Sequence, residues 1–436
     1  MSETPTQETS SKAAKKPGIG DLLKNRNFRY LWTGQSISDF GDSLTNLTLL
    51  ILVNQLTGSA AAIATMLIML AIPHITFGLL AGVFVDRWDR KRVMIASDAI
   101  RGVLVLGFML VGSVDTLWLL YLIAFLQASV GTLFTPARGA LMPHIVGRDM
   151  LMAANSLSQT SRILFNLLGT AAAGVIVGLS GNYWIPFVID ALTFFASLFM
   201  ISLIVVPAAA NEHRAGGGNV AVVFKQLREG VGLIFHTPAL SGTMVATMMT
   251  MLGIGAVNVL IIPLIVNDLK VPVTWFGMVE IAQTAAMILS GSLITILAAR
   301  LKPTNIVSGA LSVMGLMTIA LAFVSSVWHL LPVLFVVGLM MTPMQASIST
   351  LMQTNTPPQV LGRVGAALNT IISTASLVSM AFAGALGELI GVRNVFVVGG
   401  IIVILAGLTA AWMFRGYKVP STDPHSKASV SEGAAS

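Results

Sequence analysis

The sequence has no cysteine and few charged residues. Its 436 residues are 10% charged and 55% hydrophobic, whereas an average soluble domain is about 25% charged and roughly 45–50% apolar. Without cysteine the chain can form no disulfide bond and no thiolate metal site. So little charge excludes an ordinary soluble enzyme and a disordered chain. A mean hydropathy of +0.85 agrees with a chain embedded in a membrane.

Several motifs of enzymes are also missing. The chain has no GxxxxGK[ST] nucleotide-binding loop, no HExxH zinc motif and no GxSxG nucleophile motif. We therefore expect no enzymatic activity, no cofactor and no metal site. The formal net charge of +7 could by itself indicate a nucleic-acid partner, so the positions of the basic residues decide that question.

Long apolar runs fill most of the chain. A helix needs about 20 apolar residues to cross the ~30 Å hydrocarbon core of a bilayer. The runs are too long for the ~10-residue strands of a membrane β-barrel. We predict an all-α membrane protein with twelve transmembrane helices, at residues 29–54, 60–84, 93–113, 117–136, 156–178, 183–206, 240–265, 274–298, 304–325, 328–350, 364–388 and 394–414.

Lys and Arg are unevenly distributed between the connecting segments. Of the 25 basic residues, 21 lie in the N-terminal tail, in every second loop after it (Arg138 among them) or in the C-terminal tail. The remaining loops hold only Lys270 and Arg393. The positive-inside rule then places both termini in the cytoplasm and requires an even number of crossings. The basic charge therefore indicates orientation in the cell (cytoplasmic) membrane and not a nucleic-acid partner, and we expect a multi-pass monomer.

The predicted helices divide into two groups of six. We predict a tail at 1–27, a first half at 28–206, a linker at 207–239, a second half at 240–415 and a tail at 416–436. Within the linker, apolar residues between Val220 and Phe235 recur at helical spacing. They predict either an amphipathic helix on the cytoplasmic membrane surface or a simple linker helix.

The two halves share a weak internal repeat. Gly41 and Asn46 recur as Gly253 and Asn258, and the Thr-Pro pair at 135–136 recurs at 342–343. Two parallel six-helix repeats are typical of secondary transporters, which bind substrate between the halves.

The loop after the second predicted helix carries a motif. It reads Gly82-Val-Phe-Val-Asp86-Arg87-Trp-Asp89-Arg90-Lys91-Arg92. This resembles the signature loop of the major facilitator superfamily, except that Asp89 stands where the family often has glycine. Residues 38–42, 134–143 and 227–230 are similar to the drug-efflux branch that contains macrolide-efflux permeases and the enterobactin exporter. The resemblance covers nearly the whole chain. It implies the major facilitator fold and multidrug efflux of small lipophilic or amphiphilic compounds by alternating access.

The resemblance also implies that this loop acts as a gate. Asp86 would face the start of the eleventh helix, near 362–365, where a carboxylate at a helix N-terminus is worth roughly 0.3–1 kcal/mol when exposed. Arg87 and Arg90 can add ion pairs. The predicted gating residues are Gly82, Asp86, Arg87, Arg90 and Lys91. The alternative is that the basic residues of the loop serve only the topology.

Seven ionisable residues lie within the predicted helices, and each costs on the order of 3 kcal/mol at a helix centre. They are Asp39, Asp42, Asp98, Arg101, Arg162, Asp190 and Glu280. Five acids and two bases leave three acids without a basic partner of their own. A carboxyl group without a cationic partner in a medium of low dielectric constant favours its protonated form. The excess of acids therefore predicts protons as the coupling ion for transport of a small-molecule substrate. With export, the direction that the resemblance implies, the chain would be an antiporter.

Helical spacing suggests which of these residues meet. Asp39, Asp42 and Asn46 share one helix face, Asp98 and Arg101 are three residues apart, and Arg162 has Asn166 on the same face. The predicted proton-coupling or substrate residues are Asp39, Asp42, Asn46, Asp98, Arg101, Arg162, Asn258 and Glu280, the last two near Gln283 in the second half. We interpret Asp190 as structural, and a purely structural network is the alternative for the others.

Two other functions remain open from the sequence. The chain could export or import one specific solute, such as a siderophore or a lipid precursor. It could also be a membrane permease subunit that acts with a separate ATPase.

Overall fold

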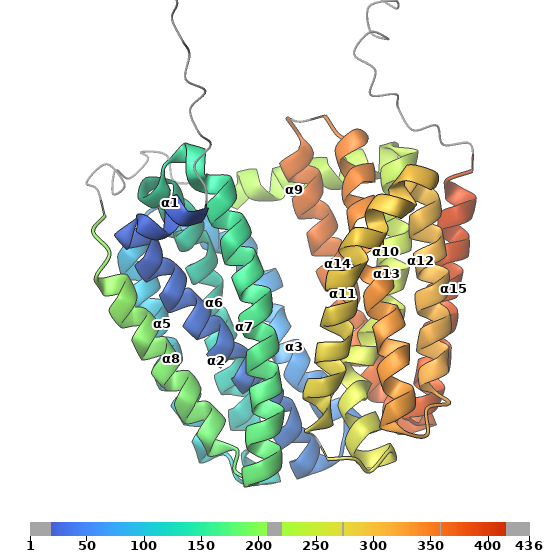
Figure 1. Ribbon diagram of the computed structural model, residues 1–436, viewed down its shortest axis with the longest axis horizontal. Coiled ribbons are helices and arrows are strands. Elements are labelled where there is room, and N and C mark those ends of the chain that lie inside the picture. The colour runs from blue at the N-terminus through green and yellow to red at the C-terminus, as the bar shows by residue number, and fades with distance from the viewer. Residues whose placement is uncertain (1–18, 207–219, 273, 358, 416–436) are drawn as a thin grey trace, which may run out of the picture.

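The computed structural model describes residues 19–206, 220–272, 274–357 and 359–415, and within these ranges every regular element is a helix (Figure 1). The α-helices are α1 (Ile19–Lys24), α2 (Arg26–Thr57), α3 (Ala60–Thr76), α4 (Gly78–Val85), α5 (Arg90–Gly107), α6 (Leu117–Val146), α7 (Leu151–Ser180), α8 (Trp184–Ser202), α9 (Val220–His236), α10 (Pro238–Pro263), α11 (Trp275–Arg300), α12 (Pro303–Leu321), α13 (Val327–Thr354), α14 (Leu361–Ile390) and α15 (Val392–Met413). A π-helical turn, Leu264–Asp268, extends α10.

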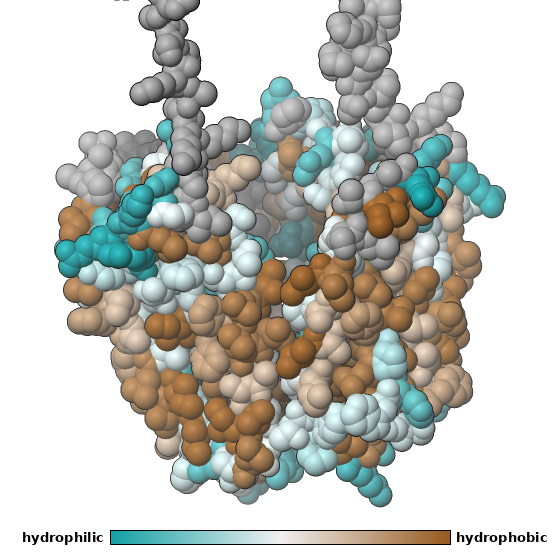
Figure 2. Space-filling model, in the orientation of Figure 1, coloured by the Kyte–Doolittle hydropathy of each residue, from teal (hydrophilic) through white to brown (hydrophobic). Residues whose placement is uncertain are grey.

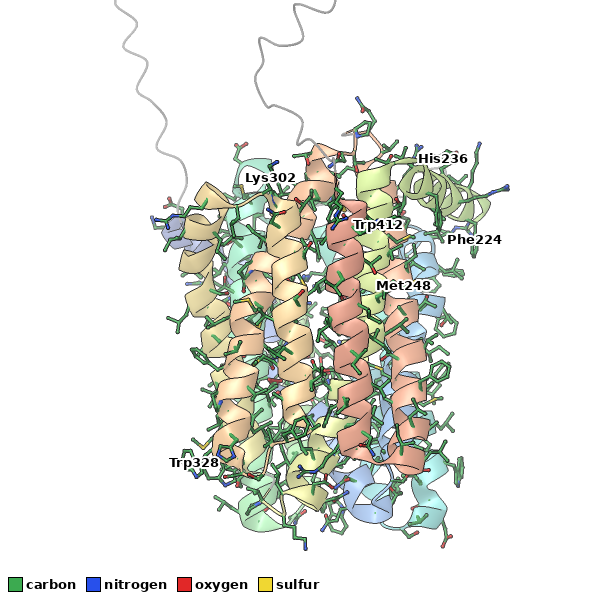
Figure 3. The ribbon with its side chains drawn as sticks, turned by 90° about the vertical axis from the view of Figure 1, so that its right-hand side faces the viewer. Phe224, His236, Met248, Lys302, Trp328 and Trp412 are labelled. Carbon is green, nitrogen blue, oxygen red and sulfur yellow. The ribbon has the colours of Figure 1, made fainter. Side chains whose placement is uncertain are left out.

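Nine helical segments in the described part of the chain are long and apolar enough to cross a membrane, and α3 is a shorter apolar helix. Figure 2 shows hydrophobic residues over the middle of the visible face and hydrophilic ones toward its two ends. In Figure 3, Lys302 lies at one end of the helices and Trp328 at the other. This distribution suits a chain that crosses a bilayer several times.

Two of the differences between the helices and the predicted runs bear on the site. The predicted helix 60–84 is broken at Phe77 into α3 and α4, one turn after Pro73 and directly before Gly78, two residue types that weaken a helix. The predicted end at residue 136 is wrong, because α6 continues to Val146 with Pro136 inside it. It ends at Gly147, whose φ of +76° is a conformation that favours glycine.

The packing of the helices repeats along the chain. In the first group α2 packs against α7 and α8, and α5 against α6 and α8. In the second group α10 packs against α14 and α15, and α12 against α13 and α15. Figure 1 shows the two groups side by side, with α3 between them. The groups meet through α3 with α14 and α7 with α11, which are equivalent pairs in the repeat.

Helix α9 lies across one end of the molecule (Figure 1). The sequence predicts a helix here, either an amphipathic one on the membrane surface or a simple linker helix. It packs on the first turns of α14, and Glu229 forms an ion pair of 2.8 Å with Arg363. Residues 1–18 of the predicted tail 1–27, the predicted tail 416–436 and the linker residues 207–219 lie outside the described residues. The remainder of the N-terminal tail forms α1 and the start of α2. We call the end that carries α9 the α9 end.

The two groups are in direct contact at the end opposite α9. Small residues make this possible: a Cβ atom added at Gly384 would lie 2.5 Å from the Cβ atom of Ala64 and 3.0 Å from the Cα atom of Ala61. The side chains of Asn54 and Asn267 exchange hydrogen bonds of 3.3 Å, and the Ser59 hydroxyl donates to Glu388. We call these contacts the seal. Toward the α9 end the molecule is hollowed between the groups (Figure 2).

Candidate functional site

A cavity of about 510 Å³ lies within the first group, mainly between α2, α3, α6 and α7. This size is within the roughly 300–1,000 Å³ of pockets that hold small molecules. Its charged lining residues are Asp39, Asp42, Arg101, Arg138 and Arg162, joined by His74. A second cavity of about 360 Å³ shares His74 and Thr135 with it and reaches Asn369, Thr370 and Ser373 of α14. The two cavities together connect the polar faces of both helix groups.

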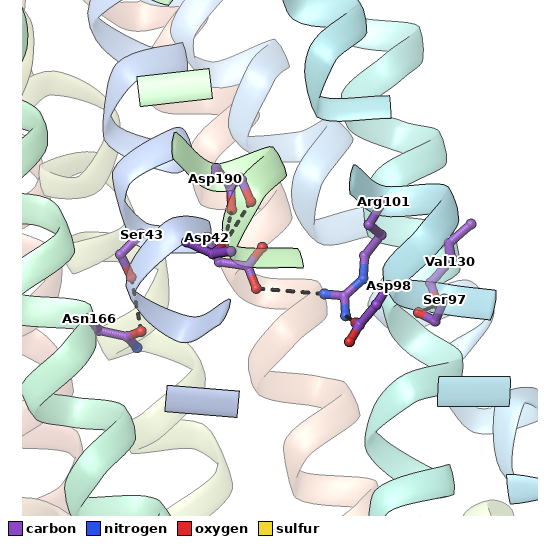
Figure 4. Close-up of polar contacts among 9 residues, drawn as sticks. Asp42, Ser43, Ser97, Asp98, Arg101, Val130, Asn166 and Asp190 are labelled. Atoms are coloured by element: carbon purple, nitrogen blue, oxygen red, sulfur yellow. Dashed lines mark hydrogen bonds and ion pairs between the residues drawn. The ribbon is translucent and has the colours of Figure 1, made fainter. Parts of the chain in front are cut away.

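Arg101 is the centre of a buried ionic network (Figure 4). Its guanidinium lies 2.6 Å from Asp98, one turn earlier on α5, and 3.6 Å from Asp42 on α2. The guanidinium also lies over the rings of Phe134, at 5.0 Å, and Phe194, at 4.4 Å. Such a planar, weakly hydrated cation is well suited to pairing and stacking at once. The network therefore ties α2, α5, α6 and α8 together, and it contains three of the predicted residues.

Asp39 and Arg162 line the same cavity without a direct partner. Within the described ranges neither side chain makes a hydrogen bond or an ion pair. Arg138 donates one hydrogen bond of 3.0 Å to the Gln35 amide oxygen. Asp39, Arg138 and Arg162 are close enough to interact electrostatically. The sequence predicts Arg138 in a cytoplasmic loop. This prediction is wrong, because α6 continues past residue 136 and places Arg138 at the cavity.

Two asparagines complete this wall of the cavity. Asn46 lines it from α2, as its spacing from Asp42 predicts. Asn166 lines it from α7, one turn after Arg162, and accepts a hydrogen bond of 2.9 Å from the Ser43 hydroxyl (Figure 4). The predicted cluster around Asp39, Asp42, Arg101 and Arg162 is thus brought to one cavity.

Asp190 lies behind this cluster, fully buried between α8 and α2. It accepts a hydrogen bond of 3.1 Å from the Thr193 hydroxyl. The approach requires glycine on α2, because a Cβ atom added at Gly41 would lie 2.3 Å from the Asp190 carboxylate and 2.2 Å from the Thr193 hydroxyl. The side chain does not line the cavity described above.

The predicted cluster of the second half is not assembled in the same way. Among the described residues no hydrogen bond joins Asn258 to Glu280, and neither lines the two cavities described. Gln283 contacts the sulfur of Met341 at 3.7 Å. The contribution of the second group to the described cavities is the uncharged polar face of α14.

The motif loop between α4 and α5 is partly structural. Asp89 is the N-cap of α5 and accepts a hydrogen bond of 2.8 Å from the backbone N–H of Arg92. Lys91 donates to the carbonyls of Ser202 and Ile204 at the end of α8. Gly82 lies in α4, Arg90 is buried, and Arg87 is exposed.

The predicted partner of Asp86 at the start of α14 is not engaged in this conformation. The Asp86 side chain is exposed and has no hydrogen bond or ion pair in the part of the chain that the structure describes. The α14 residue Arg363 is bound by Glu229 of α9 instead.

Sequence reasoning missed several residues of the site. Gln35, Gln127, Phe134 and Arg138 line the cavity. Gln127, Phe134 and Arg138 share one face of an uninterrupted α6 by their helical spacing, and the predicted end at residue 136 concealed that Arg138 belongs to this face.

Comparison with known proteins agrees with this architecture. The chain is 24% identical over 391 residues to macrolide efflux protein A of Streptococcus pyogenes, covering 86% of this chain and 93% of that protein. It is 24% identical over 378 residues to the multidrug efflux pump Tap of Mycobacterium bovis, covering 85% and 89%. Both relatives are named as efflux proteins, and their sequence identity to this chain is low.

Solved structures share the fold. A bacterial homologue of the iron transporter ferroportin in an inward-facing state superposes with a TM-score of 0.73 at 14% identity, covering 90% of this chain and 99% of that one. The nucleoside transporter NupG gives a TM-score of 0.72 at 15% identity, with 90% and 100% covered. The model of the Major Facilitator Superfamily matches residues 31–373 and 243–435. The chain belongs to the Major Facilitator Superfamily and is a multi-pass membrane transporter, not an enzyme.

Proposed function

We propose that the chain is a proton-coupled antiporter that exports small amphiphilic compounds by alternating access. The observation that carries this proposal is the position of Asp39 and Asp42, which line a cavity hollowed toward the α9 end while the seal closes the opposite end. Efflux as the direction is supported by the names of the relatives. The cavity volume of about 510 Å³ suits a small molecule.

The proposed membrane arrangement has twelve crossings in two six-helix halves, 28–206 and 240–415. Nine segments meet the length and apolarity of a crossing, and α2, the broken pair α3–α4 and α11 supply the other three. The repeated packing of the two groups supports this division. The distribution of basic residues places the α9 end and both termini in the cytoplasm. The conformation is then open to the cytoplasm, and the chain acts as a monomer.

Coupling follows from competition at the carboxylates. A proton and the cationic group of a substrate cannot occupy the same carboxylate, so one leaves when the other binds. Substrate entering from the cytoplasm displaces protons from Asp39 or Asp42, and rocking of the halves exposes the loaded site to the outside. External protons then release the substrate. Closure toward the cytoplasm brings Asp86 to the N-terminus of α14, where the helix dipole favours a carboxylate.

The test uses proteoliposomes whose lumen represents the outside, with the lumen at pH 6 and the bath at pH 7.5. Uptake of Nε-dansyl-lysine, its methyl ester and its Nα-acetyl derivative is measured by fluorescence with and without the gradient. We expect gradient-driven accumulation by the native chain and its loss in Asp39→Asn and Asp42→Asn, with downhill exchange retained. Glu280→Gln is tested in parallel, and Asp149→Asn, exposed beyond the cavity, is the matched control.

Full gradient-driven accumulation by the Asp39→Asn, Asp42→Asn and Glu280→Gln variants would exclude proton coupling through these acids. Accumulation that needs ATP and a partner protein instead of the gradient would favour the permease-subunit alternative. Accumulation with the opposite gradient would favour an importer.

A further inference from the structure

We infer that the cavity takes a zwitterionic amphiphile, with its cationic group at Asp39 and Asp42 and its anionic group at Arg138 and Arg162. This inference rests on the proposed antiport. It follows from the distribution of charge on the cavity wall, where an acidic region around Arg101 adjoins a basic region of two guanidiniums that form no ion pair with a described carboxylate.

The acidic region surrounds one guanidinium. Arg101 is paired with both Asp98 and Asp42, so this cluster has one more negative than positive charge when all three groups are ionised. Asp42 is the accessible member, with 35% of its side chain exposed, whereas Asp98 is fully buried. A cation from the substrate therefore meets Asp42, and Asp39 one turn away, without opening the Arg101–Asp98 pair.

The basic region consists of two guanidiniums that no carboxylate holds. Neither Arg138 nor Arg162 has an acidic group within 4.0 Å among the described residues. A guanidinium has five N–H donors in a planar fork, and Arg138 uses one of them on Gln35. Carboxylates, phosphates and sulfates match this geometry, and their charge-assisted bonds are stronger than neutral ones.

Arg138 lies nearer the α9 end than the two carboxylates do, and Arg162 lies at about the level of Asp39. Arg138 lies roughly two turns before α6 ends, and Arg162 roughly three turns after α7 begins, both counted from the α9 end. Asp39 and Asp42 lie roughly four turns into α2 from the same end. A molecule that bridges Asp42 and Arg138 therefore holds its cationic group deeper and its anionic group toward the cytoplasm.

A molecule with a single charge fits this wall less well. A monocation at Asp39 is repelled by Arg138 and Arg162, which interact electrostatically with that carboxylate. A monoanion at the two arginines favours a protonated Asp39, so it would move in the same direction as the proton and not in exchange for it. A zwitterion satisfies both regions and still exchanges its cation for a proton.

The remaining lining residues fit the uncharged part of such a molecule. Leu50, Leu67, Leu70 and Phe134 give the cavity an apolar surface. The facing wall of α14 contributes the uncharged Asn369, Thr370 and Ser373. Neither surface adds a charge that would change the balance of the two regions.

The experiment compares the three dansyl compounds, which share one apolar body. At about pH 6, below the pKa of an α-amino group, Nε-dansyl-lysine is a zwitterion, its methyl ester is a cation and its Nα-acetyl derivative is an anion. Saturable binding to the purified full chain in nanodiscs is measured from dansyl fluorescence. We expect the zwitterion to bind at least about tenfold more tightly than either analogue, because each analogue loses one charge-assisted contact.

Two variants assign the two regions. Arg162→Gln should abolish the preference for the zwitterion over the cationic ester, and Asp39→Asn should abolish its preference over the anionic derivative. Arg300→Gln, exposed at the cytoplasmic end of α11, should leave both preferences unchanged. Arg162 and Arg300 are both exposed, so neither substitution is expected to unfold the protein. Thermal unfolding curves of the two variants check this.

The outcomes separate the inference from the proposed function. Binding of the ester or the acetyl derivative as tight as that of the zwitterion overturns the inference, as does the absence of saturable binding of the zwitterion. One outcome is that the chain prefers the zwitterion, that this preference depends on Arg162, and that uptake does not depend on the pH gradient. This outcome supports the charge assignment and overturns the antiport. Gradient-driven uptake of the ester in preference to the zwitterion supports antiport and overturns the charge assignment.

Discussion

Replacing Gly384 with alanine should shift the protein toward a conformation that is open at the end opposite α9. Gly384 lies in the seal, where α14 crosses the first turns of α3. Its missing side chain is what lets the two helices come this close. The clash introduced by alanine exists only while the seal is closed, because the helices separate when that end opens.

The size of the shift follows from the distances. The added Cβ atom would lie 2.5 Å from the Cβ atom of Ala64, whereas ordinary contacts are 3.4–4 Å. The helices must therefore separate by about 1 Å or more, and overpacking of this kind costs about 1–3 kcal/mol. If opening relieves this cost, the ratio of open to closed molecules at this end rises about 5- to 150-fold.

The assay uses the absence of native cysteine. Spin labels on Asn182→Cys and Ser325→Cys, both exposed in loops at this end, report the distance between the two groups by double electron–electron resonance. The Gly384→Ala background should give a longer or broader distance distribution. Gly309→Ala is the matched control, because a Cβ atom added there has no neighbour within 4 Å.

The reasoning is refuted by one combination of results. If Gly384→Ala leaves the distance distribution unchanged but lowers the thermal unfolding temperature more than Gly309→Ala does, the clash is absorbed inside the closed state. The contacts of the seal would then not be the ones that break during transport.

Three further predictions concern the buried network and the α9 end, and each is checked by thermal unfolding in detergent. Arg101→Met should lower the free energy of unfolding by about 3–5 kcal/mol, because it leaves Asp98 buried without its cation. Adding Asp98→Asn should restore part of the loss, and a double variant that is no more stable than Arg101→Met would contradict this. Gly41→Ala should lower the free energy of unfolding by about 1–3 kcal/mol through overpacking against α8. Gly139→Ala should not, because its Cβ atom meets no atom within 4 Å, and equal effects of the two would count against the close packing of α2 on α8. Glu229→Gln should change stability by less than about 1 kcal/mol, since the pair it breaks is exposed on both sides, and high salt should remove even that difference.

The sequence was informative where a physical requirement leaves few alternatives. A helix that crosses a bilayer must be long and apolar, so each predicted run overlaps helix in the structure, although the run 60–84 is divided between two helices. The failure at α6 has a specific cause. Pro136 and Arg138 together resemble the end of a helix, but Pro136 is accommodated within α6, and Arg138 reaches Gln35 in the cavity instead of solvent. The cavity is therefore lined by three arginines, one more than the two that lie within the predicted helices.

The second half shows why a repeat does not transfer a site. Gly41 and Gly253 are equivalent in the repeat, and both allow close packing against the last helix of their group. Behind Gly41 lies the carboxylate of Asp190, whereas behind Gly253 lie the backbone of Gly399 and the side chain of Val403. The repeat thus preserves the distance between helices and not the chemistry, so the charged cluster of α2 has no counterpart around Asn258.

This difference between the halves bears on which contacts can change during transport. Arg101 holds Asp98 at 2.6 Å in a fully buried position, and both lie within the first group. The pair can therefore remain intact while the groups rock. Asp42 is more exposed, and its distance of 3.6 Å to Arg101 is the longer of the two. A proton or a substrate cation can therefore replace Arg101 at Asp42 without leaving a buried guanidinium unpaired. The cost of an unpaired buried charge is then avoided at every step, so in the proposed antiport Asp42 is the exchangeable carboxylate of the network and Asp98 is its permanent one.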